Sequence, residues 1–91
     1  MREVTIENTI YKMAPMDVDQ AEEIFAEKVP IRSNKKLLTA CLHNGDPGNN
    51  WNEAMVGKLP YHVFSELLPI ALEVCHMEKD KEGEAQAAKK E

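Results

Sequence analysis

The sequence has few aromatic residues, no excess of positive charge and no long uninterrupted apolar run. Aromatic residues make up 5% of its 91 positions, so any core must be aliphatic and rich in methionine. The formal net charge is −5. Nucleic-acid binding normally requires a concentrated basic face, and the one local basic cluster, Arg32, Lys35 and Lys36, is short. We therefore expect no nucleic-acid partner.

The longest apolar-rich stretch, residues 59–77, is too interrupted to span a bilayer. It contains polar residues and a proline at His62, Ser65, Glu66, Pro69 and Glu73. The N-terminal residues also lack the apolar segment of a secretory signal. These features predict a cytoplasmic protein with no membrane partner.

Cysteine is scarce, and its spacing does not match a metal site. Cys41 and Cys75 each lie among apolar residues at helical spacing, which favours buried free thiols in a reducing compartment. Together with His43, His62 and His76 they could supply metal ligands. Zinc sites, however, use tight pairs such as C-x-x-C or H-x-x-x-H, and the chain has none. We expect no metal.

No arrangement of residues indicates catalysis. Cys75 and His76 are sequence neighbours, and adjacent helical side chains point about 100° apart, so they do not readily share a hydrogen bond. The loop GDPGNN lacks the lysine and helix start of a phosphate-binding loop. The sequence therefore predicts a protein that is not an enzyme, with no catalytic residues and no cofactor.

The N-terminal residues 2–13 predict a β-hairpin. Val4 and Ile6 alternate with polar neighbours, and Glu7-Asn8 supplies the turn. Ala14-Pro15 ends the second strand because proline disfavours ladder pairing. Two strands alone are marginally stable, so the hairpin must pack on helices or on strands of another chain.

The middle of the chain predicts three helices. Asp17 is an N-cap and Gln20 completes a capping box, beginning a helix that Val29-Pro30 ends. The apolar face expected for this helix consists of Val18, Ala21, Phe25 and Val29, with Ile24 beside them. Ser33 or Asn34 caps a second helix that runs to about His43 and stops at Gly45. Its inward residues are Leu37, Leu38, Cys41 and Leu42. The polar loop 44–50 follows, and then a short helix over 51–58.

Residues 59–77 predict the longest apolar helical face of the chain. One row of this face consists of Val63, Leu67, Ile70 and Val74, and the adjoining row of Phe64, Leu68, Ala71 and Cys75. Pro60 suits the first helical position. Pro69 removes a backbone hydrogen bond inside the helix, so we expect a kink or a break between Leu67 and Ile70. The helix either curves over its own core there or hinges to expose the face to a partner.

The elements combine into a fold of the α+β class that is mainly α, with the N-terminal β-hairpin packed on a bundle of three to four short helices. We expect a single small domain over residues 1–78. Residues 79–91 are charged and contain nothing large to bury, so we expect a disordered tail.

Four residues are candidates for protein binding: Trp51, Phe64, Leu67 and Leu68. Trp51 follows the polar loop, where an indole either anchors a partner or forms a lid over the core. The other three lie on the apolar face of residues 59–77.

The stretches REVTIENTIYKMAPMDVDQAEEI and KLLTACLHNGDPG…VGKLPYHVFSELLPIAL resemble the tail assembly chaperones of long-tailed bacteriophages. The first resembles the family's strand pair leading through a proline into a helix. The second resembles its helix, polar loop and closing helix. Together these stretches extend the resemblance over most of residues 1–77.

The resemblance implies a non-enzymatic protein of the host cell cytoplasm. Such chaperones bind the helical tape measure protein, or other phage tail proteins, and keep it soluble for assembly of the tail tube; they often form homo-oligomers. Two alternatives remain open: a structural subunit of a phage tail or neck, and a small helical regulatory module that binds another protein.

Overall fold

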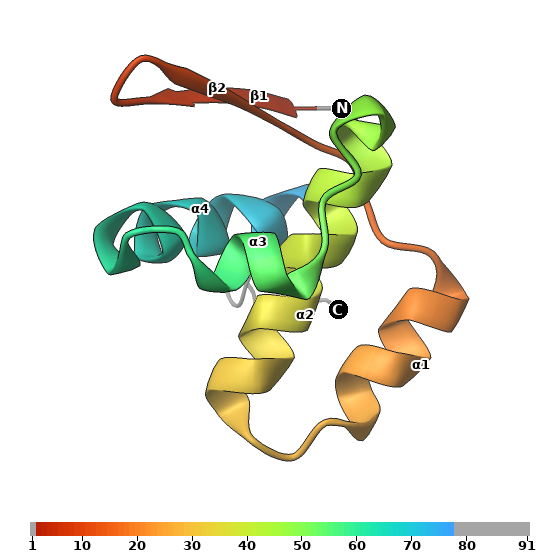
Figure 1. Cartoon of the computed structure of the whole chain (residues 1–91). Coiled ribbons are helices and arrows are strands. Elements are labelled where there is room, and N and C mark those ends of the chain that lie inside the picture. The colour runs from red at the N-terminus through yellow and green to blue at the C-terminus, as the bar shows by residue number, and fades with distance from the viewer. Residues whose placement is uncertain (1, 78–91) are drawn as a thin grey trace.

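The computed structural model describes residues 2–77, in which an antiparallel hairpin is followed by four α-helices and one 3-10 turn (Figure 1). In chain order the elements are β1 (Arg2–Ile6), β2 (Thr9–Met13), α1 (Val18–Ala26), α2 (Pro30–Gly45), η1 (Pro47–Asn49), α3 (Glu53–Gly57) and α4 (Tyr61–Val74). The predicted α+β, mainly α class is confirmed. The predicted tail over 79–91 lies outside the described residues.

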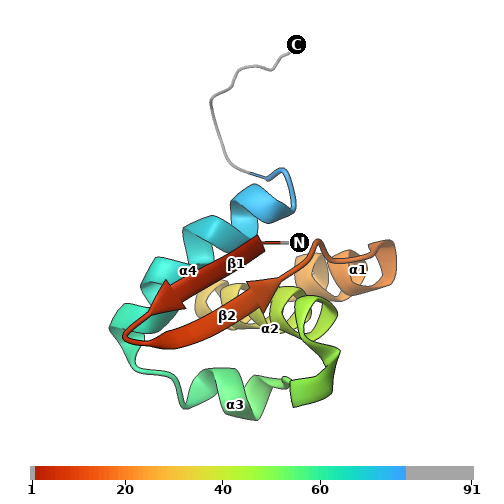
Figure 2. The ribbon, with the colours of Figure 1, turned by 90° about the horizontal axis from the view of Figure 1, so that it is seen from above.

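The hairpin covers one side of the helices. Seen from above, it lies across α2 and α4, with β2 packed on α2 and β1 on α4 (Figure 2). Val4 pairs with Tyr11, and the two-residue turn at Glu7-Asn8 has φ angles of 51° and 68°. Two positive φ angles define a type I′ turn, whose twist matches that of paired strands. The turn predicted at these residues is confirmed.

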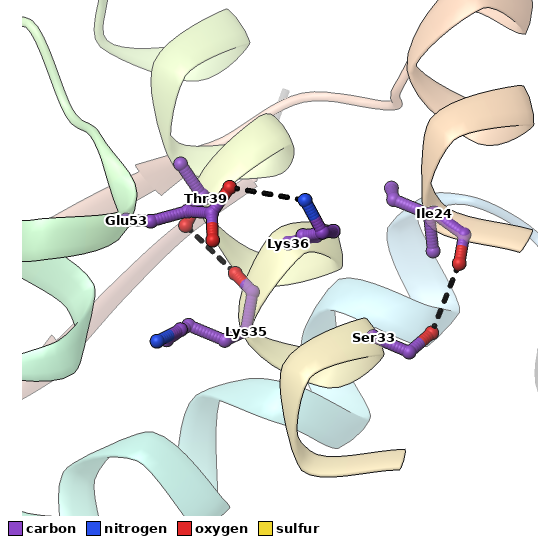
Figure 3. Close-up of polar contacts among 6 residues, drawn as sticks. All are labelled: Ile24, Ser33, Lys35, Lys36, Thr39 and Glu53. Carbon is purple, nitrogen blue, oxygen red and sulfur yellow. Dashed lines mark hydrogen bonds and ion pairs between the residues drawn. The ribbon is translucent and has the colours of Figure 1, made fainter. Parts of the chain in front are cut away.

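Helix α2 is the centre of the fold, because it contacts the hairpin and the three other α-helices. The four residues predicted to face inward, Leu37, Leu38, Cys41 and Leu42, are all buried. The predicted start at Ser33 or Asn34 is wrong. Proline occupies the first turn and presets its φ, so α2 begins at Pro30 and the preceding helix ends earlier, at Ala26. The Ser33 hydroxyl donates instead to the Ile24 carbonyl of α1, at 3.3 Å (Figure 3).

The apolar face predicted for α1 is wrong. The structure buries Ile24 and leaves Val18 83% and Phe25 67% exposed, with Val29 exposed and Ala21 half-buried. Helix α1 is only nine residues long and packs mainly on α2, so a narrow strip of its surface is covered. Apolar spacing on one helix does not specify which of two adjoining strips faces the neighbour.

A polar clamp between Gln20 and Asn44 fixes the rotation of α1 on α2. The two side-chain amides bond reciprocally, at 3.2 Å from Gln20 Nε2 to Asn44 Oδ1 and 2.7 Å from Asn44 Nδ2 to Gln20 Oε1. Asn44 Nδ2 also donates to the Pro15 carbonyl at 3.0 Å. Gln20 completes the predicted capping box, accepting from the Asp17 N–H at 2.9 Å. The Gln20 side chain thus takes part in both the N-cap and the clamp. Because it bonds Asn44 of α2, the side of α1 that carries Ile24 faces α2.

Replacing Asn44 by alanine is expected to loosen α1. The substitution removes three hydrogen bonds, of which the two to Gln20 are partly shielded from water and the one to Pro15 is exposed. We expect a loss of about 1–2 kcal/mol in the free energy of unfolding. Amide hydrogen exchange should accelerate in α1 more than in α4. Asn34→Ala is the matched control, because Asn34 lies on the same helix and makes no side-chain hydrogen bond within residues 2–77. Equal exchange in the two variants would contradict the clamp.

Helix α4 runs through Pro69 without interruption from Tyr61 to Val74, so the alternative of a break between Leu67 and Ile70 is wrong. Proline lacks the N–H that would bond the Ser65 carbonyl, and both Pro69 and Ser65 are exposed. Water can therefore solvate that carbonyl, which explains why the helix continues. Pro60 is the N-cap residue and not the first helical residue as predicted, an offset of one position.

The predicted short helix over 51–58 is present as α3, with Asn52 as its N-cap accepting from the Met55 N–H at 3.0 Å. Lys36 Nζ of α2 lies 3.4 Å from Glu53 Oε2, and this ion pair links the start of α3 to α2 (Figure 3). Within residues 2–77 no helix combines the length and apolarity needed to cross a bilayer.

Candidate binding groove

An open apolar groove of about 340 Å³ lies where the start of α2, the end of α3 and the start of α4 converge. We call it the α2–α4 groove. Its lining residues are Ile31, Lys35, Val56, Gly57, Leu59, Tyr61 and Phe64. Most of them are apolar, which is the usual lining of a binding site in proteins.

The α2–α4 groove has a fixed floor and an exposed rim. Val56 and Phe64 are buried, and their packing against the core holds the floor in place. Ile31 and Tyr61 on the rim are 51% and 73% exposed. The Tyr61 ring lies over Phe64, with centroids 6.1 Å apart and planes at 32°. Large apolar side chains at the rim are therefore available to a partner without any change in the fold.

The rim residues are exposed because each stands at the start of a helix. Ile31 follows Pro30 and Tyr61 follows Pro60. A helical side chain leans toward the N-terminus and normally covers the preceding turn of its own helix. No turn of the same helix precedes these two residues, so their own helices cover little of the side chains that line the groove.

Lys35 adds a positive charge to the apolar lining. Its aliphatic stem lies over Gly57, where a Cβ would be 3.9 Å from Lys35 Cδ. The ion pairs among residues 2–77 are Arg2–Glu73, Lys36–Glu53 and His62–Glu7, and none involves Lys35. The groove therefore suits a partner that presents apolar side chains next to a carboxylate.

The structure brings only one of the four predicted binding residues to the groove, namely Phe64. Leu67 is 0% exposed and belongs to the core, and Leu68 is partly buried against that core. Trp51 is also partly buried, and its ring lies 6.2 Å from that of Tyr11 in the hairpin. The four residues therefore do not form one surface.

Sequence reasoning missed the rim of the groove, Ile31 and Tyr61, together with Lys35. The available signal was a proline followed at once by a large apolar residue, at Pro30-Ile31 and Pro60-Tyr61. The same pattern also occurs at Pro15-Met16 and Pro69-Ile70, so it does not identify the rim by itself. Proline marks the first turn of a helix, where a side chain is least covered. That the two helix starts meet beside α3 follows only from the tertiary structure.

A second hollow, of about 220 Å³, lies between α1, α2 and the start of α3 and has a different character. Its polar lining includes Asp19, Glu23, His43 and the ion pair of Lys36 with Glu53. Across residues 2–77, no three His, Cys, Asp or Glu side chains are placed to hold a metal ion together. The α2–α4 groove differs in having large apolar residues exposed at its rim, which offer contact area to a partner, and it is the candidate binding site for that reason.

Comparisons of the chain with protein-family models, with curated proteins and with solved structures give no match. The chemistry of the α2–α4 groove is thus the guide to its function: a fixed apolar floor, two exposed apolar rim residues and one cation.

Proposed function

We propose that this protein is a non-enzymatic binding module that shelters an amphipathic helical segment of a client protein in the α2–α4 groove. The observation that carries this proposal is the exposure of Ile31 and Tyr61 above a fixed apolar floor. Exposed apolar residues grouped at a hollow mark interaction sites more often than isolated ones do.

A helical client fits the size and chemistry of the groove. A volume of about 340 Å³ accommodates a few apolar side chains, as an amphipathic helix offers at positions i, i+3 or i+4 and i+7. An acidic residue beside those positions would meet Lys35 at the wall.

The resemblance to phage tail assembly chaperones supplies a specific client. We propose that the client is the tape measure protein of a long-tailed phage and that the module keeps it soluble in the host cytoplasm until the tail tube assembles. Covering an apolar stripe of a long helical protein lowers its tendency to aggregate, because exposed apolar patches drive association.

Substituting the groove rim should reduce client solubility in co-expression. Co-expression with a tape measure protein should move that protein into the soluble fraction. Ile31→Glu removes an apolar side chain from the rim and places a carboxylate one helical turn from Lys35, where it competes with the acidic residue of the client. It should weaken binding by about tenfold or more, which corresponds to about 1.4 kcal/mol. Binding is measured by titration calorimetry with the soluble client segment.

Ile10→Glu is the matched control for Ile31→Glu. Ile10 is 56% exposed, on the outer face of the hairpin and outside the groove lining, so the same change there should leave binding unchanged. Equal effects of both variants, or no effect of the wild type on client solubility, would refute the proposal. Presence of the protein in purified virions would favour the structural-subunit alternative, because a chaperone leaves before maturation.

A further inference from the structure

Two thiols that are far apart in the sequence meet between α2 and the end of α4. The Sγ atoms of Cys41 and Cys75 lie 3.4 Å apart, and both cysteines are free. The proposed binding function does not use this contact. It lies at the C-terminal end of α4, whereas Tyr61 and Phe64 lie at the N-terminal end.

The fold holds both thiols in place. Cys41 is fully buried in α2, and the carbonyl of the same residue accepts a hydrogen bond from the Ala14 N–H at 3.0 Å. Cys75 is the C-cap of α4, and the chain then turns through His76 with φ of 58°. The Met77 N–H bonds the Leu72 carbonyl at 2.8 Å, which completes a Schellman motif around Cys75. Their proximity therefore results from two anchored backbone segments.

We propose that Cys41 and Cys75 are a redox-modification site, at which a low-molecular-weight disulfide such as oxidised glutathione converts them to an intramolecular disulfide. Bond formation requires the Sγ atoms to approach from 3.4 Å to about 2.05 Å. The product fastens the C-terminal end of α4 to the centre of the fold.

The order of the reaction follows from exposure. Cys75 is partly exposed, so its thiolate attacks one sulfur of oxidised glutathione, forming a mixed disulfide and releasing one glutathione thiol. Cys41 then loses its proton to solvent and attacks Cys75 Sγ, which releases the second glutathione thiol. The protein gives up two electrons and two protons, and the small disulfide takes them up.

The second step requires the buried Cys41 thiol to ionise. Burial raises the pKa of the Cys41 thiol far above its usual range, and the neighbouring Cys75 adds to the shift. Only the thiolate is a nucleophile, so a protonated Cys41 delays closure of the ring. The mixed disulfide at Cys75 should therefore accumulate transiently.

The disulfide should raise thermal stability strongly. It closes a loop that includes η1, α3 and all of α4, and this restricts the unfolded chain. For a loop of this length in a small domain, the unfolding midpoint should rise by about 10 °C or more.

The test treats the reduced full chain with excess oxidised glutathione at mildly alkaline pH and follows it by intact-mass spectrometry and thermal melting. The expected product is a monomer lighter by two hydrogens, with a raised midpoint that dithiothreitol reverses. A lasting glutathione adduct, a disulfide-linked dimer or unmodified protein would each overturn the proposal.

Two variants and one labelling experiment separate the steps. Cys41→Ala should stop at the mixed disulfide, and Cys75→Ser should leave Cys41 unmodified. Brief alkylation of the native wild type should label Cys75 before Cys41, which tests the order even where Cys41→Ala fails to fold. Rapid modification of Cys41 in Cys75→Ser, or labelling of Cys41 first, would contradict the mechanism.

Discussion

Gly45→Ala is expected to destabilise the protein by about 3 kcal/mol, enough to unfold much of a domain this small. A Cβ at Gly45 would lie 2.6 Å from three backbone atoms of β2: the Lys12 carbonyl oxygen and the N and Cα of Met13. Backbone cannot rotate away as a side chain can, so α2 and the hairpin must separate. Alanine gains up to about 1 kcal/mol of helix propensity over glycine, which is less than the cost of the clash.

The measurement is chemical denaturation, and Gly48→Ala is the matched control. A Cβ at Gly48 meets no atom within 4 Å, so the same substitution there should change the free energy of unfolding by about 0.5 kcal/mol or less. Wild-type stability of Gly45→Ala would show that β2 does not approach α2 this closely.

Leu67→Ala is expected to cost about 2–5 kcal/mol of stability, because Leu67 is fully buried and its loss leaves a cavity in the core. Its effect on client binding should be secondary to this loss. Leu67 was predicted to bind a partner because it lies on the apolar face of residues 59–77. This variant tests whether Leu67 instead faces the core.

Leu68→Ala is the comparison for Leu67→Ala, since Leu68 is the next residue of α4 and only partly buried. Its cost should be distinctly smaller in the same urea titration. If both variants lost similarly little free energy of unfolding, Leu67 would not be buried against α2 and β1.

In α4, Phe64 belongs both to the core and to the groove floor, whereas the other core residues and the exposed rim residue are distinct. The inner row, with Val63, Leu67 and Ala71, is buried and supports the fold. The first turn, with Tyr61, contributes exposed apolar surface to the α2–α4 groove. Substitutions at the helix start are therefore suited to testing binding, because they remove little core.

For some residues the predicted position or state was correct, but the interaction that explains it was not predicted. Gly45 was expected to stop α2, and α2 does end there. Its φ is not positive, however, and glycine is required by the close approach of β2. Likewise, Cys41 and Cys75 were expected to be buried free thiols. Both are free, but Cys75 is only partly buried, and its sulfur atom lies 3.4 Å from that of Cys41. Both cases depend on a neighbour distant in the sequence.

The sequence by itself determined the elements whose signals are local: the turn at Glu7-Asn8, the capping box of Asp17 and Gln20, and the inward face of α2. Each depends on residues within about one turn, so the pattern is readable along the chain. Only the tertiary structure decided which strip of α1 is buried, which thiols meet and where Ile31 and Tyr61 form a groove. These outcomes depend on how helices rotate and pack against one another. On α1, where two adjoining strips are apolar, the spacing leaves that rotation open.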